Sequence, residues 1–421
     1  MKKIYLFLSM VMFALTTFAQ AWDGTSRTAW VNGEGTAANP YLIETPAHLV
    51  YLSDRVVAGE TFEGKHFRLT TNLDMGGVEF PAIGKFDKSV DPVTNQETEA
   101  SLYFLGVFDG NYHTIDNLLI TKAPGVTGSI EGQEMSLGGA GLFACSNNGT
   151  VIRNLIIGAK SRIDVASDVV GAIIGKMEGG TLENSANLGV VSANTFAGGL
   201  VGAMTGNAII QNCANKGTVS TTGMQAGGIV AQLEKTSKVV ASYNTGAVNC
   251  NSFYGGGITG LIWDQIVIAN VYNLGKVTSP ASFMGTPQAI VSDVDGSAFK
   301  VEKALYVQEL TAVGDTYGTN QTVEEMKSDA ALEKLNAGLE TPAFVKDATG
   351  INNGFPILAW EASVAAGLHR LEGAAPISGN ATVVYNLSGQ VVATGATAQP
   401  TQPGVYLVVR PGQPAMKMMV K

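Results

Sequence analysis

The sequence predicts an all-β protein, a parallel β-helix (solenoid) with short capping helices, followed by a small C-terminal β-sandwich-like domain. Three observations lead to this prediction. A repeat of about 29 residues runs from Gly141 to Val277. Glycine makes up 51 of the 421 residues, against a usual share of about 7%, while helical periodicity is lacking in the repeat region. The chain is also longer than the usual limit for a single compact core. This length favours an elongated array of repeats.

The chain is expected to be exported. Lys2 and Lys3 form a short positive segment, an apolar run follows from Ile4 to Leu15, and residues 19–21 have the small-x-small pattern of a cleavage site. We therefore assign residues 1–21 to a Sec-type signal peptide, because the apolar run is too short to span a hydrocarbon core of about 30 Å. This assignment predicts a secreted or cell-surface protein with no transmembrane segment after signal removal. The net charge of −9 argues against nucleic acid as a partner.

Two short motifs alternate through the repeat. The first is rich in glycine, as in residues 198–202, 227–231 and 256–260. In the second, one asparagine recurs in steps of 28, 29 and 29 residues, at Asn187, Asn215, Asn244 and Asn273. Each strand within such a repeat is too short to be stable alone, so stacked turns must share one buried interior.

The repeated glycines and asparagines are predicted to be structural. Glycine suits corners, where φ is positive or where two backbones approach closely. Asparagine tolerates left-handed backbone and can bond to its own turn or the next. Ligand or metal contact is the alternative for these asparagines. A binding site breaks the symmetry of a repeat, however, whereas the same amide at every turn predicts an internal ladder.

Three cysteines, Cys145, Cys213 and Cys250, are too few for a disulfide framework. Cys213 and Cys250 lie inside the repeats, where a small buried side chain fits, so buried thiols are expected. A disulfide between Cys213 and Cys250 is the alternative, and a redox or metal role is a further one.

The N-terminal flank is predicted to close one end of the solenoid. Thr45 and Pro46 suit the N-cap and the first turn of a helix that extends to about Val57. Two strand-like segments follow, at residues 66–73 and 103–108.

The C-terminal flank is predicted to close the other end. Thr322 and Glu325 form a capping box for a helix that extends to about Leu335. A strand containing proline is expected near residues 355–360.

The repeats resemble GLUG motifs, named for a Gly-Leu-any-Gly core such as residues 199–202. Residues 106–115 are similar to the Gly-Thr-Phe-Asp-Gly-Asn-Gly-His-Thr-Ile signature that precedes these motifs in secreted proteins of Bacteroidota and some Gram-positive bacteria. The resemblance covers about residues 22–361 and implies a right-handed β-helix of the kind found in surface proteins, adhesins and some large peptidases. Ala231, in place of a glycine, and Ala241, in place of an asparagine, depart from the pattern.

The last residues resemble the C-terminal sorting domain of the type IX secretion system. Residues 402–406 occupy the place of its Pro-x-Gly-x-Tyr strand, and residues 417–421 that of its terminal strand with lysine. This resemblance implies the outer-membrane secretion machinery as a partner of the tail, and a plain β-sandwich module is the alternative. The predicted order of segments is a signal peptide (1–21), N-terminal cap and first turns (22–140), GLUG-type repeats (141–292), C-terminal turns and capping helix (293–361), linker (362–375) and sorting-like β-domain (376–421).

The residues that carry chemistry do not favour an enzyme. The four histidines lack the paired helical spacing of zinc peptidases: His48, His66, His113 and His369. From Ser185 to Val277 the only carboxylates are Glu234 and Asp264, so a catalytic groove of paired carboxylates is not expected along that face. We expect no cofactor and no metal. For residues 109–111, a calcium site is the alternative to a simple turn.

Aromatic residues in the last repeats indicate a possible contact surface. Tyr243 and Tyr272 lie in the repeat register and are expected in the core, whereas Phe253, Tyr254 and Trp263 lie off it and are the candidate ligand contacts. The expected function is non-catalytic adhesion or ligand interaction, with an unknown host, matrix or glycan ligand. A carbohydrate-binding accessory protein is the alternative, and a polysaccharide-degrading enzyme is a further one.

Overall fold

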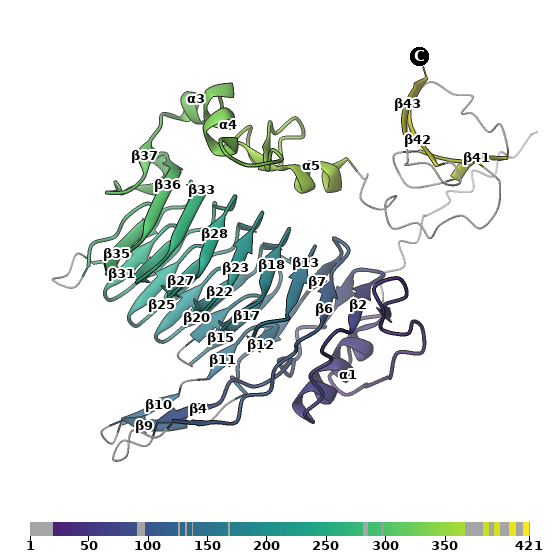
Figure 1. Ribbon diagram of the computed structural model, residues 1–421, viewed down its shortest axis with the longest axis horizontal. Coiled ribbons are helices and arrows are strands. Elements are labelled where there is room, and N and C mark those ends of the chain that lie inside the picture. Colours follow the sequence, from purple (N-terminus) through teal and green to yellow (C-terminus); the bar gives the residue numbers. More distant parts are fainter. Residues whose placement is uncertain are drawn as a thin grey trace, which may run out of the picture.

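A computed structural model describes residues 20–90, 97–124, 127–130, 133–136, 138–166, 169–280, 285–296, 298–366, 382–386, 391–395, 404–409 and 416–420. The main body is a parallel β-solenoid, which confirms the predicted fold class (Figure 1). The signal peptide assigned to residues 1–21 lies outside the described residues, except for its last two positions.

A complete turn of the solenoid contributes five short strands. In the turn that begins at Val151, these are β13 (Val151–Arg153), β14 (Ile156–Ile157), β15 (Arg162–Val165), β16 (Val169–Gly171) and β17 (Ile174–Met177). Each strand pairs in parallel with its counterpart in the next turn, so that Ile152 lies beside Leu182, which in turn lies beside Ile210. These three side chains are fully buried, and the rows of such residues form one continuous aliphatic interior.

The strands stack in five rows along the solenoid (Figure 1). The first row contains β1 (Tyr41–Ile43), β2 (His66–Leu69), β6 (Val107–Asp109), β13, β18 (Thr181–Glu183), β23 (Ile209–Gln211), β28 (Lys238–Val240), β33 (Val267–Asn273) and β36 (Lys300–Tyr306). The second contains β3 (Leu73–Asp74), β7 (Thr114–Asp116), β14, β19 (Ala186–Asn187), β24 (Ala214–Asn215) and β29 (Tyr243–Asn244). The two rows join where β29 pairs with the long strand β33. Strand β33 then pairs with β36, and β36 pairs with β37 (Thr319–Asn320).

The other three rows complete the circumference. The third contains β8 (Leu119–Ile120), β15, β20 (Val190–Ala193), β25 (Val219–Thr221), β30 (Val248–Cys250) and β34 (Val277–Thr278). The fourth contains β11 (Gly139–Ala140), β16, β21 (Phe196–Gly198), β26 (Gln225–Gly227) and β31 (Tyr254–Gly256). The fifth contains β12 (Phe143–Ser146), β17, β22 (Val201–Met204), β27 (Val230–Glu234), β32 (Thr259–Trp263) and β35 (Val291–Asp295).

The repeated asparagines form the predicted ladder. Each side-chain Nδ2 donates to the Oδ1 of the asparagine in the next turn, from Asn187 to Asn215 at 2.9 Å, on to Asn244 at 2.8 Å and on to Asn273 at 2.8 Å. Each Nδ2 also donates to the backbone carbonyl two residues later, at 2.9 to 3.0 Å, and all four side chains are fully buried. The ladder therefore satisfies its own polar groups inside the protein.

The glycines of the glycine-rich motif are required by close packing against this ladder. A Cβ on Gly199 would lie 2.5 Å from Cγ of Asn215, and one on Gly228 would lie 2.4 Å from Cγ of Asn244. The glycines of this motif do not have positive φ, which occurs at asparagines such as Asn184 and Asn212, with φ of 49° and 54°, and at corner glycines outside the motif such as Gly180 and Gly206. For the glycines of the motif, close approach is therefore the correct explanation.

The N-terminal cap is confirmed in outline. Helix α1 (Pro46–Val57) begins after Thr45, whose side chain accepts a hydrogen bond from the backbone of His48. Its apolar side is buried against the first turn. The strand predicted at residues 66–73 is split into β2 and β3 by a corner, and the one predicted at 103–108 is regular only in β6, which begins at Val107.

The C-terminal helices differ from the prediction. The single helix expected to reach Leu335 is two, α3 (Val323–Met326) and α4 (Asp329–Asn336), because Ser328 accepts a hydrogen bond from the backbone of Ala331 and starts a second helix. The strands β38 (Phe344–Val345) and β39 (Ile357–Leu358) follow. Helix α5 (Ala359–Ala365) replaces the end of the strand expected at 355–360 and the start of the expected linker 362–375, whose remainder from residue 367 lies outside the described residues.

These helices do not cap the end of the solenoid. They run back along its side, over the outward face of the second row (Figure 1). The end is closed instead by the loop after helix α2 (Gln308–Thr311), where the Asp315 carboxylate accepts hydrogen bonds from the backbone of Ile290 at 2.6 Å and Val291 at 3.1 Å.

The remaining strands lie outside the solenoid. They form two hairpins, β4 (Lys88–Val90) with β5 (Glu97–Glu99) and β9 (Thr127–Ile130) with β10 (Gln133–Ser136). The described tail strands β40 (Thr382–Asn386), β41 (Val391–Gly395), β42 (Gly404–Val409) and β43 (Met416–Val420) form one antiparallel sheet instead of the predicted sandwich. Across the described ranges, no helix is long and apolar enough to cross a membrane.

Candidate ligand-binding groove

The corners between the first and second rows form a regular outward-facing series. The residues at this position have left-handed backbone, with φ between 48° and 56°: Asn154, Asn184, Asn212, Ala241 and Asn270. Their backbone N–H groups bond to the next turn, as from Asn184 to Gln211 at 3.2 Å. Successive corners are therefore spaced by one strand separation, about 4.8 Å.

The two ends of this corner series are engaged within the protein. The Asn154 amide donates to Asp109 at 3.0 Å, and the Asn270 amide donates to the carbonyls of Leu335 and Ala337 at the end of α4. In the middle of the series, the side-chain amides of Asn184 and Asn212 have no hydrogen-bond partner among the residues that the structure describes. Both side chains are partly exposed, so these amides can reach solvent or a ligand.

A C-terminal segment, residues 339–361, crosses these corners, and we call it the strap. The Trp360 ring stacks on Tyr112, with centroids 5.5 Å apart and planes at 18°, and its Nε1 donates to the Asn212 carbonyl at 2.8 Å. Between the strap and the corners lies an open groove of about 570 Å³. It is lined by Tyr112, Asn184, Gln211, Asn212, Val240, Ala241, Leu339, Glu340, Thr341, Pro342, Ala343, Ala359 and Trp360.

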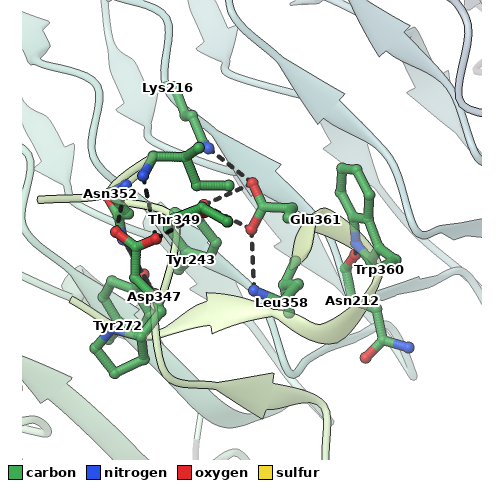
Figure 2. Close-up of polar contacts among 12 residues, drawn as sticks. Asn212, Lys216, Tyr243, Tyr272, Asp347, Thr349, Asn352, Leu358, Trp360 and Glu361 are labelled. Carbon is green, nitrogen blue, oxygen red and sulfur yellow. Dashed lines mark hydrogen bonds and ion pairs between the residues drawn. The ribbon is translucent and has the colours of Figure 1, made fainter. Parts of the chain in front are cut away.

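A buried polar network holds the strap in place (Figure 2). The Glu361 carboxylate accepts a hydrogen bond from the Tyr243 hydroxyl at 2.8 Å, pairs with the Lys216 ammonium at 2.7 Å and accepts from the backbone of Leu358 at 2.9 Å. Glu361 is only 5% exposed, so its charge is stabilised by these donors rather than by water. Burial and the nearby Glu361 charge raise the pKa of Tyr243 well above its usual range.

A second contact anchors the strap beside the first. Tyr272 stacks on Tyr243 with centroids 4.7 Å apart, and its hydroxyl donates to the Pro356 carbonyl and accepts from the Asn352 amide. The Asp347 carboxylate accepts hydrogen bonds from four groups in the loop that carries Asn352. Tyr243 and Tyr272 are thus buried, as predicted, but under the strap and not in the solenoid interior.

The three residues predicted as ligand contacts differ in how exposed they are. Trp263, in β32, is 43% exposed, whereas Phe253 is partly buried. Tyr254, in β31, is 9% exposed, and its ring centroid lies 6.3 Å from that of Phe253. None of the three lines the groove.

The calcium alternative at residues 109–111 is wrong for Asp109. One carboxylate oxygen of Asp109 faces Arg68 and Arg153 at 3.3 Å, and the other accepts from Asn154 and from the backbone of Asn111. Arginine side chains and N–H donors therefore occupy both carboxylate oxygens of Asp109. Over the described part of the chain, no three His, Cys, Asp or Glu side chains converge as a metal site would require.

The three cysteines are free and buried. The alternative disulfide between Cys213 and Cys250 is not formed, and the favoured buried-thiol prediction is confirmed. Burial raises the pKa of the Cys213 thiol and so keeps it protonated and unreactive.

Sequence reasoning missed the residues that build the groove. Tyr112, Asn184, Asn212 and Trp360 all lie in segments with a structural pattern, and nothing in the repeat separates Asn184 and Asn212 from the corner asparagines that the protein uses itself. One signal was present: Ala241 breaks the asparagine pattern in the groove lining.

The fold and groove define an elongated β-solenoid with a ligand-sized cleft on its side. No family model matches the chain, so the resemblance to GLUG-motif proteins stays a prediction. The chain is 28% identical over 196 residues to halomucin from Haloquadratum walsbyi, which covers 47% of this chain and 2% of that protein. It is also 28% identical over 171 residues to a provisionally named Gly-rich membrane protein from Evansella cellulosilytica, covering 40% and 17%.

A solved structure shares the fold. It is a Bacteroides ovatus protein provisionally named an immunoglobulin A1 protease, with a TM-score of 0.55 and 20% identity, covering 78% of this chain and 94% of that one. At this identity the likeness concerns the solenoid architecture alone. The chain spans only a small part of the length of the two sequence relatives.

Proposed function

We propose that this chain is an exported, non-catalytic binding protein that presents its groove on the side of a rigid solenoid outside the cell. The groove under the strap is the observation that carries the proposal. Trp360 is fixed by both a ring stack and a hydrogen bond, so the aromatic wall is preformed. A preformed site loses little conformational entropy when a ligand binds.

The polar groups near the groove support binding rather than catalysis. Among the described residues that line it, Glu340 supplies the sole carboxylate, on the exposed rim. The neighbouring Glu183 accepts a hydrogen bond from Gln211 at 2.8 Å, and Glu361 is held by Lys216 and Tyr243. Hydrolysis of a glycosidic bond generally uses two carboxylates that flank it.

Export is supported by the pattern of residues 1–21 and by the similarity to halomucin through almost half of the chain. We further propose that residues 376–421 act as a sorting module for the outer-membrane secretion machinery. The support for this is the type IX resemblance at residues 402–406, together with the antiparallel sheet of the tail.

Fractionation of the native organism and sequencing of both ends of the mature protein would test export. We expect a protein in the medium or on the cell surface that begins at Trp22 and lacks the sorting module. A cytoplasmic protein that retains residues 1–21 would contradict the proposal.

Incubation of the purified protein with polysaccharides and with immunoglobulin A1 would test the absence of catalysis. We expect no new reducing ends, no unsaturated ends and no cleaved peptide bonds. Turnover of either substrate would contradict the proposed non-catalytic role.

A further inference from the structure

We infer that the groove binds a neutral glycan, with the amides of Asn184 and Asn212 bonded to hydroxyls on neighbouring sugar units. This inference rests on the proposed binding function and names the ligand class of the same groove.

The amides are the first argument. A side-chain amide offers two donors and an acceptor, which match sugar hydroxyls that both donate and accept. The equivalent amides of Asn154 and Asn270 are used by the protein, whereas those of Asn184 and Asn212 face the groove unpaired among the described residues. In Figure 2, the side chain of Asn212 points away from the Glu361 network that holds the strap.

The spacing and the aromatic wall agree with a chain of sugars. The two amides are one turn apart, about 4.8 Å, which is close to the length of one pyranose unit in a linear glycan. The stacked pair of Tyr112 and Trp360 gives an apolar surface beside them. An aromatic wall with a few fixed polar groups is the usual construction of a small-ligand site.

The charge of the groove selects a neutral ligand. Its described lining contains no lysine or arginine, and the carboxylate of Glu340 on the rim would repel an anion. The nearby cations are already paired, Arg153 with Asp109 and Lys216 with Glu361. An anionic glycan would therefore enter without a counter-charge.

The backbone at the corners favours a glycan over an extended peptide. A peptide that adds as a strand needs free backbone N–H and C=O groups. The N–H groups of Asn184 and Asn212 bond to Gln211 and Val240, and the Asn212 carbonyl accepts from Trp360. At these two corners, the side-chain amides and not the backbone N–H groups are therefore what the groove offers.

Ala241 provides an independent argument. It has left-handed backbone with φ of 48°, although alanine is disfavoured there and asparagine occupies the equivalent corners. Ala241 lines the groove but is only 2% exposed, so the smaller side chain leaves room for the strap to lie over this corner at the cost of local strain. Strain of this kind is concentrated at functional sites.

The test uses the full exported chain on an array of neutral and anionic oligosaccharides, followed by titration calorimetry on the best neutral probe. The double variant N184G/N212G removes both amides while glycine keeps the left-handed backbone. We expect it to bind at least about tenfold more weakly, because two hydrogen bonds to the ligand are lost. Ala241→Asn restores the repeat pattern and places a larger side chain at a groove position that is only 2% exposed, so we expect binding of the probe to be lost.

Asn154→Gly is the matched control, because the same corner amide is removed outside the groove. We expect its affinity for the probe to equal that of the unaltered protein. The inference is overturned if no neutral glycan binds, if only anionic glycans bind or if the groove variants bind normally. Binding of a protein ligand that Ala241→Asn abolishes would overturn the glycan class and leave the proposed binding function intact, whereas a cytoplasmic location would overturn the proposed function itself.

Discussion

The indole Nε1 of Trp360 donates a hydrogen bond of 2.8 Å to the backbone carbonyl of Asn212, which lies 148 residues earlier in the chain. This bond joins the first turn of α5 to a corner in the middle of the solenoid. Together with the Glu361 network, it makes the groove depend on the position of the strap. Opening of the strap would remove one wall of the groove without unfolding the solenoid.

Replacement of Trp360 by alanine is expected to loosen the strap. The change removes a ring stack with Tyr112 and leaves the Asn212 carbonyl without its donor, at a cost of about 2 kcal/mol. Hydrogen exchange should report the effect at the Ala359 amide, which bonds to the Ala343 carbonyl at 2.8 Å and ties the two ends of the strap together. Amides in the solenoid interior, such as those of β23, should keep their protection.

Trp263→Ala is the control for this variant. Trp263 is 43% exposed, so its loss should change stability by no more than about 0.5 kcal/mol and leave strap exchange unaltered. Equal exchange in the two variants would show that Trp360 does not hold the strap.

Asn215→Ala is expected to destabilise the solenoid strongly. Asn215 accepts from Asn187 and donates to Asn244 and to the Gly217 carbonyl, so the change removes three buried hydrogen bonds, although Asn187 and Asn244 each keep a partner in their own turn. At about 1 kcal/mol for each buried hydrogen bond, the loss should be about 3 kcal/mol. Thermal unfolding followed by circular dichroism would measure it.

Asn249→Ala is the matched comparison. Asn249 lies on the outward side of β30, partly exposed, and bonds only to Ser220 and Thr278. Water can replace those partners, so the loss should stay below about 1 kcal/mol. Similar melting temperatures for the two variants would contradict a stabilising role for the internal ladder.

The solenoid was predictable because its repeat is local and symmetric. The step from Asn187 to Asn215 predicts both the parallel pairing and the amide ladder, since one arrangement satisfies every copy. Helix α1 was equally predictable, because Thr45 and Pro46 determine its start through adjacent residues.

The groove was not predictable, because it depends on contacts distant in sequence. Nothing near Trp360 indicates that α5 turns back to Tyr112 and Asn212, and the strap path is determined by buried partners 118 residues apart, Tyr243 and Glu361. The same reason explains why the low exposure of Tyr254 was not predictable, because its packing beside Gly285 is a tertiary contact that the repeat register does not contain.

Gly228→Ala is expected to disrupt the turns around it. The added Cβ would lie 2.1 Å from the Gly257 carbonyl oxygen and 2.4 Å from Cγ of Asn244, and neither backbone nor ladder can move alone. Overpacking in a rigid interior should cost about 3 kcal/mol or more. The yield of soluble protein and the melting temperature would measure the effect.

Gly314→Ala is the control for this glycine. A Cβ added to Gly314 would have the Tyr306 hydroxyl as its nearest neighbour, at 3.8 Å. The φ of Gly314 is not in the left-handed region. We expect a melting temperature within a few degrees of the unaltered protein. Tolerance of Gly228→Ala would mean that the glycine-rich motif is not required by packing.

Tyr272→Phe is expected to change the response of the protein to alkali. Burial, followed by the Glu361 charge, raises the pKa of Tyr272 well above the usual value of 10.0, so folding favours the protonated phenol. The stabilisation that comes from keeping this phenol protonated is complete below about pH 10, the pKa of tyrosine in the unfolded state. It is lost as the pH rises above that value, because the unfolded state then releases a proton that the folded state retains. The phenylalanine variant has no such proton to lose.

Near pH 8 the phenylalanine variant should be less stable by about 1 kcal/mol, because the bonds to Pro356 and Asn352 are absent. Between about pH 10 and about pH 11, the unaltered protein should lose up to about 1.4 kcal/mol more than the variant, so the two melting temperatures converge. A difference in melting temperature that stays constant across this range would show that Tyr272 ionises as easily in the folded state as in the unfolded one, and that the strap does not shield it from water.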